Sequence, residues 1–320
     1  MKSMNKKKVS KKNPKKIQKK KVSKVVLDKV ELTEDKNHNY NWFPGHMMKA
    51  LRDIKSKIHQ VDIVLEIRDA RSPLATGNQA LKKEIGGKSH LIVLNKANLA
   101  RPEIMEKWKA WLDKEKTPYI FVNGLQKTEL NSVIKYAKEI INSKNQKSTP
   151  DAGLLLKYKF MIVGLPNTGK STIINRLAKR DASKVADKPG QTRQQLWVNA
   201  GSDLDILDTP GVMPPNIATE EQALWLASLH AIPSNIIDDE DTACFIIRYL
   251  LKTDPTVFTK QYKFSDWDKD LISTLNEIAK ARGCLRQKGE YDYDRVYKLV
   301  IQDLRKGDLG LISFGHPPIR

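Results

Sequence analysis

The residues best suited to chemistry lie in the sequence GLPNTGKST at positions 164–172. Glycines let a backbone curl until its N–H groups point at an anion, and Lys170 could reach the β- and γ-phosphates of a nucleotide. The Ser171 hydroxyl is suited to bind Mg²⁺. A strand-like run at 158–163 precedes this sequence and a helix-like run at 173–178 follows it. The pattern therefore predicts a phosphate-binding loop.

Three further loops carry matching chemistry. Asp208 begins an Asp-x-x-Gly sequence, which suits a carboxylate linked to Mg²⁺ followed by Gly211, whose N–H faces the γ-phosphate. Thr192, in a loop with no periodicity, could supply a second hydroxyl to Mg²⁺. Asn95 and Lys96 look like the guanine-reading element of GTPases. Each pattern is common alone, but the combination favours a nucleotide site.

The elements that must position these loops alternate between strand-like and helix-like runs. Because alternating strands and helices form parallel sheets, we expect an α/β fold with a doubly wound, mostly parallel sheet. The predicted strands are 61–67, 91–94, 119–122, 158–163, 195–198 and 204–207. The candidate loops follow the ends of these strands, where open α/β sheets build their sites.

Domain boundaries are predicted from changes in composition. Residues 1–36 form a lysine-rich arm, with twelve lysines in 1–24 and no acidic residue before Asp28, so we expect disorder. Residues 37–218 form the nucleotide-binding domain. From 219 to 320 the pattern is helical, at 220–231, 242–251, 271–281 and 293–304, which predicts a small all-helical domain.

The net charge of +20 indicates a polyanionic partner, and RNA is favoured over a membrane surface. The sequence contains no apolar run of about eighteen residues, so no membrane span is expected. Cys244 and Cys284 lack the spacing of metal ligands and are interpreted as reduced thiols. The lysine arm contains no arginine, unlike a transit peptide, and contact with RNA phosphates is the favoured interpretation.

The order of the motifs is unusual, because Asn95-Lys96 and Asn123-Gly124 precede the phosphate loop. This order resembles the circularly permuted P-loop GTPases. With WFPGHM at 42–47, DARSP at 69–73 and DTPGV at 208–212, the chain most resembles the ribosome biogenesis GTPase A family. The resemblance runs from about residue 41 to the C-terminus and excludes the lysine arm.

The resemblance implies GTP hydrolysis coupled to late assembly of the large ribosomal subunit, stimulated by the ribosome. It implies a cytoplasmic, ribosome-associated monomer whose helical domain binds rRNA, with GTP, GDP and Mg²⁺ as ligands. Val212 stands where many GTPases have a water-orienting Gln, and the family's proposed substitute matches His46. Asn167 matches an asparagine that holds K⁺ in related GTPases. The expected catalytic residues are His46, Lys170 and Thr192, the metal ligands are Ser171, Thr192 and Asp208 for Mg²⁺ and Asn167 for K⁺, and the GTP-binding residues are Asn95, Lys96, Asn98, Asn123, Gly124, Asn167, Thr168, Gly169, Lys170, Ser171, Thr172 and Gly211.

One position departs from the family pattern. The guanine reader of the family ends in Asp, whereas this chain has Asn98, which offers one acceptor oxygen and a donor amide. Relaxed guanine specificity is therefore left open. Three rival functions also stay open at this point: a nucleotide-gated rRNA-binding factor with little hydrolysis, a P-loop ATPase acting on RNA, and a mitochondrial homologue that uses the lysine arm for import.

Overall fold

A computed structural model describes residues 45–145, 157–178, 196–214, 217 and 219–318. The strands are β1 (Ile63–Asp69), β2 (Ser89–Asn95), β3 (Tyr119–Val122), β4 (Tyr158–Gly164), β5 (Leu196–Asn199) and β6 (Leu204–Asp208). The helices are α1 (Gly45–Lys57), α2 (Gln79–Ile85), α3 (Pro102–Lys114), α4 (Lys127–Asn145), α5 (Lys170–Leu177), α6 (Glu220–Ser228), α7 (Asp239–Thr253), α8 (Thr256–Tyr262), α9 (Leu271–Ala281) and α10 (Tyr293–Lys306).

The six strands form one sheet in the order β3-β2-β1-β4-β6-β5. All neighbouring pairs are parallel except β5 and β6, which are antiparallel at one edge. The strand that leads into the phosphate loop, β4, lies between β1 and β6. The predicted doubly wound, mostly parallel sheet is therefore confirmed, and the loops after β1, β2, β3, β4 and β6 meet along one edge.

Helices cover both faces of the sheet because alternate strand residues point to opposite sides. On one face, Leu65 and Ile162 pack with Val133 of α4 and Ile173 of α5. On the other face, residues of β1, β4 and β6 pack with α1 and α2, while β2 packs with Leu112 of α3. The inner strands β1, β2 and β4 are buried on both faces along most of their length, which explains their continuous apolar sequences, whereas the edge strand β5 is largely exposed.

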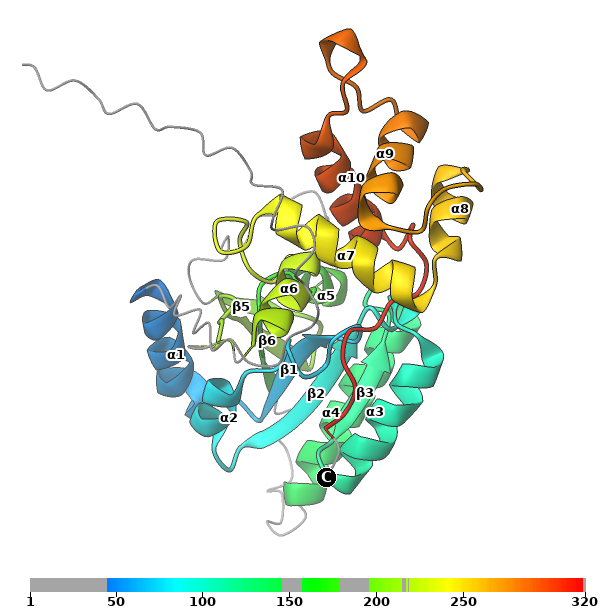
Figure 1. Ribbon diagram of the computed structural model, residues 1–320. Helices are drawn as coiled ribbons and strands as arrows, with labels where there is room; N and C mark the ends of the chain where they lie inside the picture. Colours follow the sequence, from blue (N-terminus) through cyan, green and yellow to red (C-terminus); the bar gives the residue numbers. More distant parts are fainter. Residues whose placement is uncertain (1–44, 146–156, 179–195, 215–216, 218, 319–320) are drawn as a thin grey trace, which may run out of the picture. The chain divides into compact units, whose positions relative to one another are not determined.

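Helices α7 to α10 lie together (Figure 1). They have a separate hydrophobic core, in which Ile246 of α7, Ile278 of α9 and Val300 of α10 are buried. The C-terminal segment returns from α10 to the sheet domain. Ile312 N donates to Leu99 O at 3.0 Å, and Phe314 N donates to Arg71 O. The domain boundary at 218/219 stays a prediction, and the lysine arm lies outside the described residues.

Three helical elements differ from the sequence-based expectation. Helix α7 begins at Asp239 rather than Thr242, because the Asp238 side chain caps it by accepting from Asp241 N. Helix α8 is not predicted, because Pro255 indicates a break in the helical pattern. In the structure Pro255 stands at the N-terminal cap of α8, where a fixed φ is compatible with helix initiation. Helix α6 ends at Ser228 rather than Ala231, since His230 adopts a left-handed φ of 61°. A left-handed residue stops a helix because it turns the chain away from the helical path.

Candidate nucleotide-binding site

The phosphate loop connects β4 to α5, as predicted. Gly169 has a φ of 101°, and a Cβ at this position would collide with the side chain of Asn95. Only glycine combines this φ with so close an approach. Since α5 begins at Lys170, the N–H groups of its first turn face the loop and provide positive potential for an anion.

Lys170 is buried within the loop. Its Nζ donates a hydrogen bond to Leu165 O at 2.7 Å. Burial lowers the pKa of Lys170 to about 8, although the negative charge of Asp208 acts in the opposite direction. The side chain is therefore held at the phosphate loop near Asp208, where a polyphosphate would stabilise its ammonium form.

The Asp-x-x-Gly sequence lies beside the phosphate loop because β6 pairs with β4, with Asp208 opposite Ile162. The Thr209 hydroxyl donates to Ile162 O at 2.7 Å and fixes the start of this segment. A Cβ on Gly211 would lie 2.9 Å from Pro166 N. Any larger residue at Gly211 would force these two loops apart, so the glycine allows them to share one ligand.

Asn95 ties three loops together. Its Nδ2 donates to Thr168 O at 2.8 Å, and its Oδ1 accepts a hydrogen bond from Gly124 N at 2.8 Å. The sequence predicts Asn95, Thr168 and Gly124 at one site, but it indicates no contact between them. In this structure the buried amide connects the guanine-reading loop and the Asn123-Gly124 turn to the phosphate loop.

Lys96 also contacts the phosphate loop. It has a left-handed φ of 61°, and its Nζ donates to Asn167 O at 2.7 Å and lies 3.1 Å from Asp69 Oδ2. Asp69 is paired bidentately with Arg71 at 2.9 Å. Burial alone would raise the pKa of Asp69, but the charges of Arg71 and Lys96 hold that pKa well below its usual value.

This ion-pair cluster explains the DARSP sequence, whose residues were not predicted to lie at the site. Arg71 is 2% exposed, and its Nη1 also donates to Leu304 O at the end of α10. The sequence feature that could have indicated this role is the position of Asp69 at the end of β1, where site residues gather in a parallel sheet. The cluster therefore joins Lys96, and through it the phosphate loop, to the last helix.

A second link runs from the phosphate loop to α6. The Asn167 Nδ2 donates to His230 O at 2.8 Å, just after α6 ends. Leu165 of the same loop is buried against Leu226 of α6 and against Met213, which follows the Asp-x-x-Gly segment. The Arg305 guanidinium of α10 donates to Ser228 O at 3.1 Å and to Ala227 O at 2.9 Å. The C-terminal end of α6 thus contacts both the phosphate loop and α10.

The remaining predicted residues have fewer described contacts. His46 is the second residue of α1, and its side chain is not among the described parts of the chain. Thr192 also lies outside the described residues. Ser171 and Thr172 are half-buried in the first turn of α5, and Asn98 is exposed in the short 3₁₀ turn Ala97–Leu99. Asn123 Oδ1 accepts from Leu125 N at 3.0 Å, which shapes its own turn.

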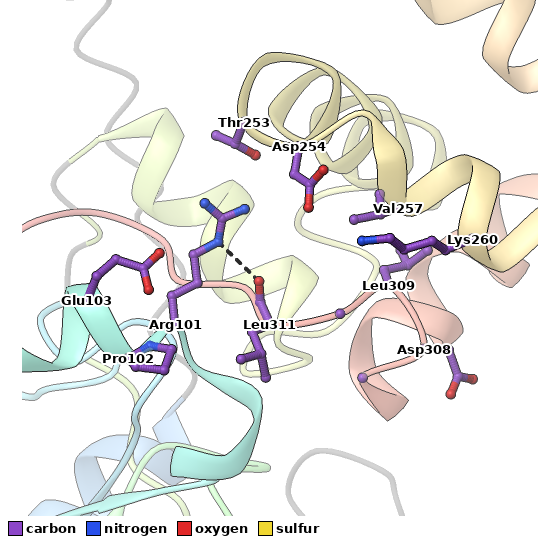
Figure 2. A pocket seen from close by; sticks show the side chains of 12 residues that line it. Arg101, Pro102, Glu103, Thr253, Asp254, Val257, Lys260, Asp308, Leu309 and Leu311 are labelled. Atoms are coloured by element: carbon purple, nitrogen blue, oxygen red, sulfur yellow. Dashed lines mark hydrogen bonds between the residues drawn. The ribbon is translucent and has the colours of Figure 1, made fainter. Parts of the chain in front are cut away.

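A cavity of about 570 Å³ lies between the start of α3, α7, α8 and the C-terminal segment (Figure 2). Arg101 Nε donates to Leu311 O at 3.1 Å across it. Its charged lining residues are Arg101, Glu103, Asp254, Lys260 and Asp308. Because acidic groups outnumber basic ones, this cavity does not suit a polyphosphate. It lies instead at the boundary between the start of α3 and helices α7 and α8.

The strand–loop–helix at 158–177, the neighbouring Asp-x-x-Gly segment and the Asn-Lys loop define a P-loop GTPase of circularly permuted order. Residues 159–283 match the family described as "50S ribosome-binding GTPase". The chain belongs to the ribosome biogenesis GTPase A family. It is 36% identical to the member from Bacillus licheniformis over 276 residues, covering 86% of this chain and 98% of the relative.

Other relatives agree with this assignment. The chain is 31% identical to ribosome biogenesis GTPase A of Thermotoga maritima, covering 87% of this chain and 94% of the relative. It is also 31% identical to mitochondrial ribosome-associated GTPase 1 of Bos taurus, with 74% of each chain covered. The crystal structure of GNP-bound YlqF from T. maritima matches with a TM-score of 0.57 and 27% identity, covering 84% of this chain and 98% of that chain. The class of enzyme is therefore a GTP hydrolase.

Proposed function

We propose that this GTPase binds the precursor of the large ribosomal subunit and couples GTP hydrolysis to its late assembly. The observation that carries the proposal is the link from Asn167 in the phosphate loop to His230 O at the end of α6. Because α6 also contacts Arg305 of α10, a change at the γ-phosphate can reach the helices. The names of the relatives supply the ribosome as the assembly on which such a switch would act.

The nucleotide is held in this proposal by the backbone N–H groups of the phosphate loop, by Lys170, and by Gly211 at the γ-phosphate. Thr168, Gly169, Ser171 and Thr172 complete the loop and the first turn of α5. The guanine base is placed against Asn95, Lys96, Asn98 and the Asn123-Gly124 turn. Support comes from the Asn95 hydrogen bonds, which hold these loops in one arrangement before a ligand arrives.

The oxygen donors at the site fit Mg²⁺, which prefers hard oxygen ligands. The Asp208 carboxylate stands at the end of β6 and the Ser171 hydroxyl follows the paired strand β4, and Thr192 is the proposed third donor. When bound, Mg²⁺ would neutralise charge on the β- and γ-phosphate oxygens. For K⁺ we propose Asn167. Because its Nδ2 is held by His230 O, its Oδ1 is the atom left to bind a cation.

Water activation is assigned to His46. Val212 is 1% exposed and packs with Ile54 of α1 and Val64 of β1, so it cannot orient a water molecule. The same apolar cluster anchors the helix that carries His46. A histidine could place water by hydrogen bonding from the start of that helix.

Binding to RNA is assigned to the helices after α6. The Arg282 guanidinium lies 5.2 Å from the centre of the Tyr262 ring, and Tyr262 stacks on Phe264. With Lys263 and Lys280, these side chains line a cavity of about 520 Å³. Tyr262 is 3% exposed and Lys280 is paired with Glu277, so the accessible groups of this lining are Lys263, Arg282 and the half-buried Phe264. Basic groups beside an accessible aromatic ring are typical of sites for unpaired RNA bases. We further propose a monomer that works in the cytoplasm, and no helix among the described residues is long and apolar enough to cross a membrane.

The test is GTP hydrolysis by the full chain in K⁺ and Mg²⁺, with and without purified large subunits. We expect subunits to stimulate turnover, excess ATP not to compete, and Lys170→Ala to show no activity. Equal rates of hydrolysis in Na⁺ and K⁺ would contradict the proposed role of K⁺ at Asn167. Turnover that subunits leave unchanged would contradict the coupling, and inhibition by ATP would indicate a P-loop ATPase.

A further inference from the structure

A basic cavity lies at the edge of the sheet opposite the nucleotide loops. Its larger part measures about 430 Å³ and its smaller part about 370 Å³, and the two share Lys88 and Lys144. The lining comes from β2, from residues just before β1 and β3, from Lys82 of α2 and from the ends of α3 and α4. Arg68, near the end of β1, also lines the larger part. Most of the lining therefore lies where these parallel strands begin, whereas the nucleotide loops lie where they end.

The charge of this cavity is strongly positive. The basic side chains of its larger part are Arg68, Lys82, Lys88, His90, Lys116 and Lys144, and Glu115 supplies an acidic one. Asp62 of the smaller part supplies a second acidic side chain. Three of the basic groups are engaged in the fold, and one of them, His90, has its Nε2 3.0 Å from Glu66 Oε2. Arg68 is paired with Glu66 at 2.9 Å, and Lys88 donates to Val61 O at 2.7 Å. Lys82, Lys116 and Lys144 are exposed, and each comes from a different helix or its end.

The lining of the cavity indicates which kind of anion it suits, a compact one or an extended one. Its floor is apolar, with Ile92 and Leu112 nearly inaccessible and Trp111 half-buried beside them. The exposed lysines come from three separate segments, α2, the turn after α3 and α4, so no single helix carries the charge of this lining. A compact anion needs convergent donors, whereas an extended polyanion is neutralised by spread lysines that displace its counterions.

We propose that this basic cavity binds the phosphate backbone of RNA. The proposal deepens the function proposed above, because the RNA in question is that of the large subunit. Lys88, which lines both parts of the cavity, comes just before β2, and this seven-residue strand separates it from Asn95 by about 20 Å. RNA at one edge and GTP at the other can therefore be bound together, and the sheet domain contacts the ribosome without blocking its own site.

The experiment compares two full-length variants with the parent. Lys82→Gln/Lys144→Gln removes two charges from the cavity. The matched control, Lys83→Gln/Lys135→Gln, removes two exposed lysines from the same helices, α2 and α4, outside its lining. The probe is protein-free rRNA of the large subunit, and its affinity is measured at a series of KCl concentrations. GTP affinity is measured in parallel to show that the fold and the nucleotide site are intact.

For the cavity variant we expect roughly tenfold weaker binding and a slope of log affinity against log salt that is shallower by about 1 to 2. The control should keep the parent slope, and all three proteins should bind GTP within about threefold of each other. Equal slopes in the cavity variant and the parent, or equal losses in both variants, would overturn the inference. Since this probe requires no GTP hydrolysis, an unstimulated GTPase that still shows the expected slopes would overturn only the proposed function.

Discussion

Lys170 is a buried cation whose charge state depends on the ligand. Its pKa of about 8 in the free protein means that the ammonium form, which polyphosphate requires, is lost as pH rises above that value. Binding above pH 8 therefore takes up a proton, and affinity falls by up to tenfold per pH unit. We expect GTP to bind about equally at pH 7 and 7.5 and about tenfold more weakly at pH 9, by calorimetric titration.

The control for this pH dependence is Lys170→Arg, which stays charged throughout the range. Its absolute affinity is expected to be lower, because a guanidinium is larger than the ammonium it replaces. Its affinity should nonetheless vary less between pH 7 and 9 than that of the parent. If GTP affinity falls equally with pH in the two proteins, the proton taken up on binding goes to a group other than Lys170.

His46 is the residue whose role matters most for turnover. We expect His46→Ala to bind GTP with an affinity close to that of the parent, because the phosphate loop is intact. Stimulated hydrolysis should fall by roughly 10²-fold, as for loss of a group that positions water. Single-turnover hydrolysis with saturating large subunits measures this directly. An unchanged rate would leave His46 with a structural role in α1.

Asn98 tests how the base is read. If its amide oxygen is the acceptor for guanine, Asn98→Asp gains one charge-assisted hydrogen bond, which is worth roughly 1.5–3 kcal/mol or about ten- to a hundredfold in affinity. The parent should in turn bind XTP better, relative to GTP, than the variant does. Competition of GTP and XTP for both proteins measures the ratio. If neither the affinity nor the ratio changes, Asn98 does not contact the base.

At the scale of elements, the C-terminal end of α6 contacts both the phosphate loop and α10, and in the proposed function it couples them. Its C-terminal carbonyls accept from Arg305, and the carbonyl of His230 beyond them accepts from Asn167. We expect Arg305→Ala to leave GTP affinity within about threefold of the parent. The difference in large-subunit affinity between the GTP-analogue and GDP states should shrink toward zero. Sedimentation with subunits in each state gives this ratio.

The control for the coupling is Lys306→Ala, an exposed neighbour on α10 that also removes one positive charge. It should retain the nucleotide dependence of the parent. If both variants lose the nucleotide dependence equally, the overall charge is responsible rather than the hydrogen bonds from Arg305 to the end of α6.

The elements also show what a sequence can reveal. The phosphate loop was predictable because strand, glycines, lysine and helix are adjacent in the chain. The joining of Asn95 to Thr168 was not, since the two residues are 73 positions apart and only the packing of β1 between β2 and β4 brings them together. The early end of α6 had no local signal either, because its last carbonyls are satisfied by Arg305 from a helix far along the chain.

At the scale of the whole molecule, the net charge of +20 is the feature that suits the proposed binding to RNA. Twelve of the lysines lie in residues 1–24, outside the described structure. We expect deletion of residues 1–36 to weaken large-subunit binding and to make its salt dependence shallower, because fewer counterions are released. GTP affinity should not change, since no nucleotide motif lies in this segment. An unchanged salt slope would leave the arm without a role in RNA contact.

The strand order has a consequence for synthesis of the chain. β1 lies in the middle of the finished sheet, yet its partner β4 begins only at residue 158. During translation β1 can pair with β2, and β2 with β3, soon after they emerge, while the other edge of β1 stays open for on the order of 5–20 s. An open apolar strand is a template for wrong pairing. Slow translation between β3 and β4 would therefore reduce soluble yield even though it changes no residue of the protein.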